Sequence, residues 1–215
     1  MKIVKLDLGD AEHLRILHEL MEKHLSEVNN TVRTIYGPPQ YDKTARAKEN
    51  SAHVNKVATL MSKVKRRFER REDHLKRAIR EGNGVVHVAF EEGKPIGYVY
   101  SYRDAKMAHA LAETIRKANG GLKNAGTEEL ARAVLFGGHG YILPDYRSKG
   151  SGKELYEQHE KAAIDDFHTT ATHRVAQLET DEEDGRRFLK KQGYKTIGTH
   201  DDREISIKRI VSFRE

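Results

Sequence analysis

Two hydrophobic periods alternate along the chain and predict strands flanked by helices. Leucine, methionine and valine recur every three or four positions between residues 11 and 28, which predicts an amphipathic helix. The same spacing predicts helical structure across residues 43–81. From residue 85 the period falls to two, so residues 85–90 and 95–102 are predicted to form a hairpin around the glycine-containing turn at 91–94.

Strand and helix patterns continue to alternate toward the end of the chain. Residues 134–143 and 172–179 have the composition of strands, and each is followed by a segment with helical spacing. Three glycines in the first of these strands indicate a bulge or the close approach of another backbone. Two more strands are predicted at 195–200 and 204–211, and an edge strand at 2–7.

Two segments depart from this alternation. Residues 29–42 contain Asn-Asn and Gly-Pro-Pro, which are typical of a loop. Residues 103–133 predict two short helices around a glycine-containing turn. A connection of about thirty residues is long for a compact domain, so we expect this second segment to be a functional or partner-binding insertion.

Composition limits the classes of protein to consider. The chain has 215 residues, of which 37% are hydrophobic, and this favours one domain spanning residues 1–215. No apolar run reaches the roughly 18 residues that a membrane span needs, so we expect a cytoplasmic protein without a membrane partner. The absence of cysteine excludes disulfides, thiolate metal sites and a cysteine nucleophile. Histidines on the first helix lack metal-ligand spacing, so no metal is predicted.

The net charge of +6 favours anionic partners. The segment from Lys63 to Arg71 carries six cations in nine residues, which could contact nucleic acid. Acidic residues between Glu69 and Asp73 interrupt this run, as on many solvated helices, and nucleic-acid recognition motifs are absent. Nucleic acid is therefore an open but disfavoured partner.

The stretch from Tyr141 to Lys153 combines a strand end, a basic loop and a helix start. Such a start offers backbone N–H groups without helical partners, the positive end of the helix dipole and, here, the cations of Arg147, Lys149 and Lys153. Gly150 and Gly152 allow unusual φ angles and the close approach of a phosphate. The sequence therefore predicts an anion-binding loop.

Two phosphate-binding patterns compete for this loop. The P-loop of nucleotide hydrolases would require glycine at 147 and a hydroxyl residue at 154, where the chain has Arg147 and Glu154. The pattern Arg-x-x-Gly-x-Gly, preceded by Ile142-x-Pro-x-Tyr146, instead resembles the acyl-CoA pyrophosphate loop of the GNAT superfamily of acyl-CoA-dependent N-acetyltransferases. The hairpin at 85–102 and the closing Phe188-x-x-x-x-Gly193-Tyr194 also resemble this family.

This resemblance implies a GNAT fold: an α/β (α+β) domain with a mixed, mostly antiparallel sheet of about six to seven strands, flanked by helices and splayed at the cofactor strand. The segments at about 43–81 and 103–133 would be helical insertions. Acetyl-CoA is then the co-substrate, with the pantetheine arm added along residue 142 like an extra strand. The implied cofactor contacts are Ile142, Leu143, Arg147, Ser148, Lys149, Gly150, Ser151, Gly152 and Lys153.

The implied reaction is direct attack of a primary amine, from a small molecule or a protein, on the thioester. His139 is the first candidate base and Glu179 the reserve, since family bases often lie on these strands. Leu189 stands where the family commonly has a tyrosine that protonates the departing thiolate, which leaves Tyr98, Tyr100 or solvent for that role.

Two further questions stay open at the level of sequence. Tyr36 and Tyr41 could contact the acceptor or merely hold a proline-containing loop in place. The missing phenol and the basic helix favour, as an alternative function, a catalytically weak CoA-binding sensor or a module for nucleic acid or another anionic partner. A homodimer is also left open.

Overall fold

The computed structural model describes residues 1–36, 47–118, 122–166, 172–179, 183–201 and 203–210. The chain divides into two compact units. One unit is Asp7–Arg77, and the other is Met1–Leu6 together with Ala78–Glu215. Each unit is described by itself below.

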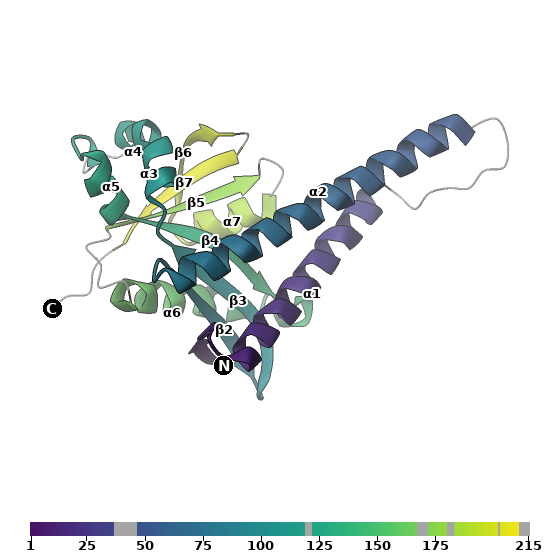
Figure 1. The fold of residues 1–215 in the computed structure, drawn as a ribbon, viewed down its shortest axis with the longest axis horizontal. Helices are drawn as coiled ribbons and strands as arrows, with labels where there is room; N and C mark the ends of the chain where they lie inside the picture. The colour runs from purple at the N-terminus through teal and green to yellow at the C-terminus, as the bar shows by residue number, and fades with distance from the viewer. Residues whose placement is uncertain (37–46, 119–121, 167–171, 180–182, 202, 211–215) are drawn as a thin grey trace. The chain divides into compact units, whose positions relative to one another are not determined.

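The Asp7–Arg77 unit is built from two long antiparallel helices, α1 (Ala11–Tyr36) and α2 (Ala47–Arg80), whose last residues belong to the other unit (Figure 1). The imidazole Nδ1 of His18 lies 3.3 Å from the carboxylate of Glu72. Two turns further along α1, His24 contacts the ring of Phe68 edge-on, with centroids 4.8 Å apart. The residue number rises from His18 to His24 along α1 while it falls from Glu72 to Phe68 along α2, as an antiparallel pair of helices requires.

The prediction of a loop at residues 29–42 is wrong for its first eight positions, because α1 continues to Tyr36. The hydroxyl groups of Thr31 and Thr34 donate to the carbonyls of Glu27 and Asn30, one turn earlier. These side chains therefore find acceptors within the helix, and each added residue also gains a backbone bond. Residues 37–42, including Tyr41, lie outside the described part of the chain, as does the side chain of Tyr36.

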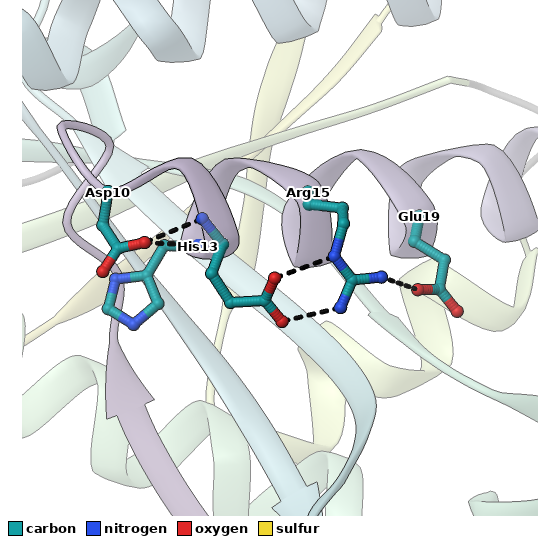
Figure 2. Close-up of polar contacts among 5 residues, drawn as sticks. Asp10, His13, Arg15 and Glu19 are labelled. Carbon is teal, nitrogen blue, oxygen red and sulfur yellow. Dashed lines mark hydrogen bonds and ion pairs between the residues drawn. The ribbon is translucent and has the colours of Figure 1, made fainter.

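The start of α1 is fixed by a side-chain cap, which Asp10 provides. The carboxylate of Asp10 accepts from the backbone N–H groups of Glu12 and His13 at 2.7 and 3.3 Å (Figure 2). These bonds stabilise the charged form and lower the pKa of Asp10. Arg15 adds a two-point ion pair with Glu12, so the first turns of the helix satisfy their own polar groups.

The second unit contains a seven-stranded sheet in the order β1-β2-β3-β4-β5-β7-β6. Within the described residues, β4 and β5 form a parallel pair and the other neighbours are antiparallel. This confirms the predicted mixed, mostly antiparallel sheet. The strands are β1 (Lys2–Lys5), β2 (Gly84–Glu91), β3 (Lys94–Tyr102), β4 (Val134–Ile142), β5 (His173–Glu179), β6 (Lys195–His200) and β7 (Arg203–Arg209).

Helices cover both faces of this sheet (Figure 1). On one face, α6 (Ser151–Asp166) and α7 (Glu183–Lys191) bury Leu155 and Leu189 against Val99 of β3. On the other face, α3 (Ala105–Ala110), α4 (Ala112–Ala118) and α5 (Thr127–Ala133) bury their apolar residues against Phe136 and Ile205. In the described residues of the segment at 103–133, three short helices complete the core where two were predicted, because α3 and α4 are separate helices on either side of Leu111. The role of this segment toward a partner stays a prediction.

Candidate functional site

Strand β4 carries a bulge at its centre. Val99 of β3 lies opposite Gly140 and Ser101 lies opposite Gly137, so one extra residue of β4 is accommodated between these pairs. This confirms the irregularity that the glycines of this strand indicated. Beyond the bulge β3 and β4 approach closely, because a Cβ atom on Gly97 would lie only 2.4 Å from the carbonyl oxygen of Tyr141.

Past this bulge, β4 and β5 part from each other. Their parallel pairing ends at Gly137 and Ala176. Beyond that pair, β4 follows β3 to Ile142, and β5 follows β7 to Glu179. The two strands therefore diverge, as the resemblance implied, and we call the space between Gly137–Ile142 and Ala176–Glu179 the strand opening.

Backbone groups of β4 are directed toward the strand opening. The N–H of Leu143 donates to the carbonyl of Ile96 on β3 at 2.8 Å. Because N–H groups alternate between the two edges of a strand, those of Gly140 and Ile142 point to the opposite edge, which β5 has left. A ligand with amide groups could add to this edge as a strand would.

A basic loop connects the strand opening to α6. The guanidinium of Arg147 donates through Nε to the carbonyl of Ile142 at 2.8 Å and lies over the ring of Tyr141, 5.5 Å from its centroid. The amine of Lys149 lies 5.7 Å from the centroid of Tyr146. These contacts hold two cations of the loop close to the end of β4.

The backbone of this loop has the geometry of an anion site. Ser148 and Gly150 adopt φ angles of 60° and 88°, and alternation into the left-handed region turns successive N–H groups toward one side. The N–H of Glu154 makes the first intrahelical bond, to the carbonyl of Gly150. The preceding N–H groups of Ser151, Gly152 and Lys153 have no partner within the helix.

The space around the loop glycines also fits a phosphate. Apart from the two chain neighbours of Gly150, no heavy atom of the described residues lies within 4 Å of the position that a Cβ atom on Gly150 would take. A Cβ atom on Gly152 would lie 3.6 Å from the side chain of Ile142, which places the helix start directly beside the strand end. Open space, N–H donors and positive charge thus meet where a pyrophosphate group would need them.

The predicted cofactor residues, Ile142, Leu143 and Arg147–Lys153, lie within one short stretch of this site. Leu143 differs from its neighbours because its N–H donates to Ile96 and its carbonyl accepts from the N–H of Tyr146. Its backbone groups therefore hold the loop, and Ile142 is the residue of this pair whose N–H is directed to the strand opening.

The candidate bases lie on the two strands that diverge. His139 lies at the bulge of β4 and Glu179 is the last residue of β5. Their side chains lie outside the described part of the structure, so their roles stay predictions. Tyr98 and Tyr100 are buried, and Tyr98 lies on the same side of the sheet as Tyr141, with ring centroids 6.2 Å apart.

A buried polar cluster beneath the sheet was not predicted from sequence. His159 of α6 is fully buried, with Nδ1 2.8 Å from Nδ1 of His87 and Nε2 2.8 Å from the hydroxyl of Ser101. Burial lowers the pKa of His159 well below its ordinary value, and the nearby charge of Arg174 acts in the same direction. His159 is therefore neutral at neutral pH.

The same cluster contains a pair of phenols and an arginine. The hydroxyl groups of Tyr156 and Tyr194 are 2.5 Å apart, and burial raises the pKa of both. The guanidinium of Arg174 lies 4.4 Å from the centroid of Tyr156. Leu189 packs in the same apolar cluster as both tyrosines. Leu189 itself carries no phenol, but the phenols of Tyr156 and Tyr194 thus belong to the same cluster.

The sequence model of the acetyltransferase (GNAT) family matches residues 54–194, which is more than half of the chain. The protein therefore belongs to this family. No curated protein matches the sequence.

Several solved structures are similar to this chain. A proposed acyl-CoA N-acyltransferase from Klebsiella pneumoniae is 11% identical, with a TM-score of 0.51 over 98% of this chain and 97% of that chain. A proposed GNAT acetyltransferase from Desulfovibrio desulfuricans is 12% identical, with a TM-score of 0.50 over 98% and 100%. PaiA N-acetyltransferase from Thermoplasma acidophilum, solved with coenzyme A, is 16% identical, with a TM-score of 0.48 over 98% and 100%. The first two structures share the fold, and at these identities their likeness shows the fold alone.

The described residues contain neither a membrane-spanning helix nor a metal-binding group of side chains. None of their helices combines the length and apolar character needed to cross a membrane. No group of three or more His, Asp or Glu side chains within the described ranges could hold a metal ion.

Proposed function

We propose that the protein transfers an acetyl or other acyl group from an acyl-CoA to a primary amine by direct attack of the amine on the thioester. The observation that carries this proposal is the direct connection of the strand opening to the loop at Arg147–Lys153. Family membership supports CoA as the donor, because both features suit its parts: an extended amide-containing arm and a pyrophosphate.

Each part of the site has a role in this reaction. The N–H groups of residues 151–153 and the cations of Arg147 and Lys149 would bind the pyrophosphate. The backbone of Ile142 would bind the pantetheine arm, and an N–H directed into the strand opening would stabilise negative charge on the thioester oxygen. Holding amine and thioester together would supply much of the rate enhancement.

Proton transfer is assigned to residues near the strand opening. His139 is the proposed base for the attacking amine, and Glu179 is the reserve. Leu189 provides no hydroxyl group, so Tyr98, Tyr100 or solvent remain for the departing sulfur. The acceptor is an amine of a small molecule or a protein.

Two measurements test the proposal. Calorimetry is expected to show acetyl-CoA binding, and a hundredfold excess over the dissociation constant should raise the free energy of unfolding by about 2 to 3 kcal/mol. Thiol release is then followed with a panel of amines. Because the chain contains no cysteine, every thiol that appears comes from CoA. Absence of CoA binding would refute the proposal.

An alternative function is CoA binding without turnover, as in a sensor or a module for an anionic partner. The apolar side chain of Leu189 favours it, because the chain lacks a hydroxyl group at that position. Acetyl-CoA binding without amine-dependent thiol release, across primary amines of both small molecules and peptides, would support this alternative over the transferase.

A further inference from the structure

Arg174 of β5 is a buried cation without a hydrogen-bonding partner. Its relative exposure is 1%, and none of its three guanidinium nitrogens has a partner among the described residues. The ring of Tyr156 covers the guanidinium but supplies no anionic group. Burying an unpaired charge is costly, so a charge held in this way calls for a counter-charge.

The nearby carboxylate acts on Arg174 through its charge but makes no hydrogen bond to the guanidinium. Glu160 of α6 lies in the same buried region, but its carboxylate accepts from the amine of Lys208 at 2.7 Å. The other polar neighbours, Tyr156, Tyr194 and His159, are neutral at neutral pH because burial disfavours their charged forms. The positive charge of Arg174 is therefore not balanced by a hydrogen-bonded anion within the cluster.

Arg174 also lies at the base of the strand opening. A Cβ atom on Gly137 would be 3.2 Å from Nε of Arg174, and Gly137 belongs to the last residue pair that joins β4 to β5. The guanidinium contacts Tyr156 of α6, the helix whose first turn carries the anion-binding loop. The cation and the loop thus share the α6 face of the sheet.

We propose, on the basis of the function proposed above, that Arg174 supplies the positive charge that stabilises the sulfur leaving CoA. In the reaction, the amine nitrogen forms a bond to the acyl carbon and the carbon–sulfur bond breaks. The electron pair of that bond moves to sulfur, giving a thiolate, and the proton of the amine passes to the base or to water. Arg174 thus acts through the electrostatic attraction between its guanidinium charge and the thiolate.

This role fits the remainder of the site. Leu189 cannot protonate the sulfur, so the sulfur departs as an anion unless another group donates a proton. A buried cation stabilises such an anion most effectively where water is excluded. A nearby opposite charge typically lowers the pKa of an acid by about 1 to 3 units.

The test measures the pKa of the CoA thiol while CoA is bound to the protein. CoA labelled with carbon-13 at the carbon bonded to sulfur is titrated at saturating protein, and the chemical shift reports the thiolate. The bound thiol is expected to have a pKa lower than that of free CoA by about 1 to 2 units. Arg174→Met should abolish this difference, and Arg174→Lys should retain part of it. Lys161→Met, which removes an exposed cation from α6, should leave it intact.

A rate measurement accompanies the titration. In Arg174→Met, kcat should fall while the KM for acetyl-CoA stays close to the wild-type value, because the field acts on the anion rather than on the neutral thioester. Since no hydrogen bond is broken by this change, the variant is expected to fold.

The outcomes separate this inference from the proposed function. If calorimetry shows no CoA binding, both are overturned. If CoA binds to the wild-type protein with an unshifted thiol pKa, the role of Arg174 is overturned and the acyltransferase proposal stands; this result needs no variant. A lowered thiol pKa that persists in Arg174→Met also overturns the role of Arg174.

Discussion

The buried pair of His87 and His159 predicts that the protein loses stability in mild acid. His159 is fully buried, and both of its ring nitrogens lie within hydrogen-bonding distance of a partner, so the folded state resists its protonation. In the unfolded chain, histidine binds a proton with a pKa of about 6.5. Below that pH the unfolded state binds one more proton than the folded state, so the free energy of unfolding falls as the pH falls.

The magnitude follows from the linkage relation. For one histidine that stays neutral in the folded state, the free energy of unfolding falls by about 2 kcal/mol between pH 7.5 and pH 5.0. The stability contribution is fully present above about pH 6.5 and is lost progressively below it. The window ends near pH 5 because carboxylates begin to bind protons at lower pH.

The assay is urea unfolding at several pH values across this window. His159→Gln should be less stable than the wild-type protein at pH 7.5, since His87 and Ser101 lose their partner, but its stability should depend less on pH. His109→Gln, which changes an exposed histidine of α3, should keep the wild-type pH dependence. Equal pH dependence in the wild type and in His159→Gln would refute the reasoning.

Three further changes test the site. Gly150→Asp places a negative side chain in the anion-binding loop and should abolish CoA binding, whereas Gly93→Asp, at a turn glycine with a similar positive φ, should bind CoA normally by calorimetry. His139→Ala should lower turnover and alter the pH–rate profile; an unchanged rate and profile would pass the role of base to Glu179. Leu189→Tyr should leave CoA affinity nearly unchanged and keep or raise turnover on a good amine, with Leu189→Phe as the control that lacks the hydroxyl. A loss of turnover specific to the tyrosine would contradict this.

The periodic parts of the chain could be predicted from sequence because their patterns have local causes. The Glu92-Gly93 turn takes left-handed φ angles of 51° and 78°, as a tight hairpin requires. The cofactor loop was predictable for the same reason, since its glycines and cations are adjacent in sequence. The end of α1 was not, because Asn-Asn favours a turn only when the following residues do not continue the helix.

The buried cluster depends on contacts that sequence spacing does not encode. Arg174 occupies an ordinary position in a strand, where an arginine is usually solvated. It is buried because Tyr156 of α6 covers it and because Gly137 of the neighbouring strand has no side chain to displace it. His87, Ser101 and His159 are far apart in sequence and meet only when α6 packs on the sheet.

The short parallel pairing of β4 with β5 has a consequence for the motions of the sheet. Four residue pairs, Val134–Gly137 with His173–Ala176, join the four strands on one side to the three on the other. The amide hydrogens of this junction should therefore exchange with solvent through openings that leave the outer hairpins intact. A ligand that contacts both diverging strands would slow amide exchange at the junction more than elsewhere in the sheet. The exchange rate of these amides would therefore show whether a ligand is bound in the strand opening.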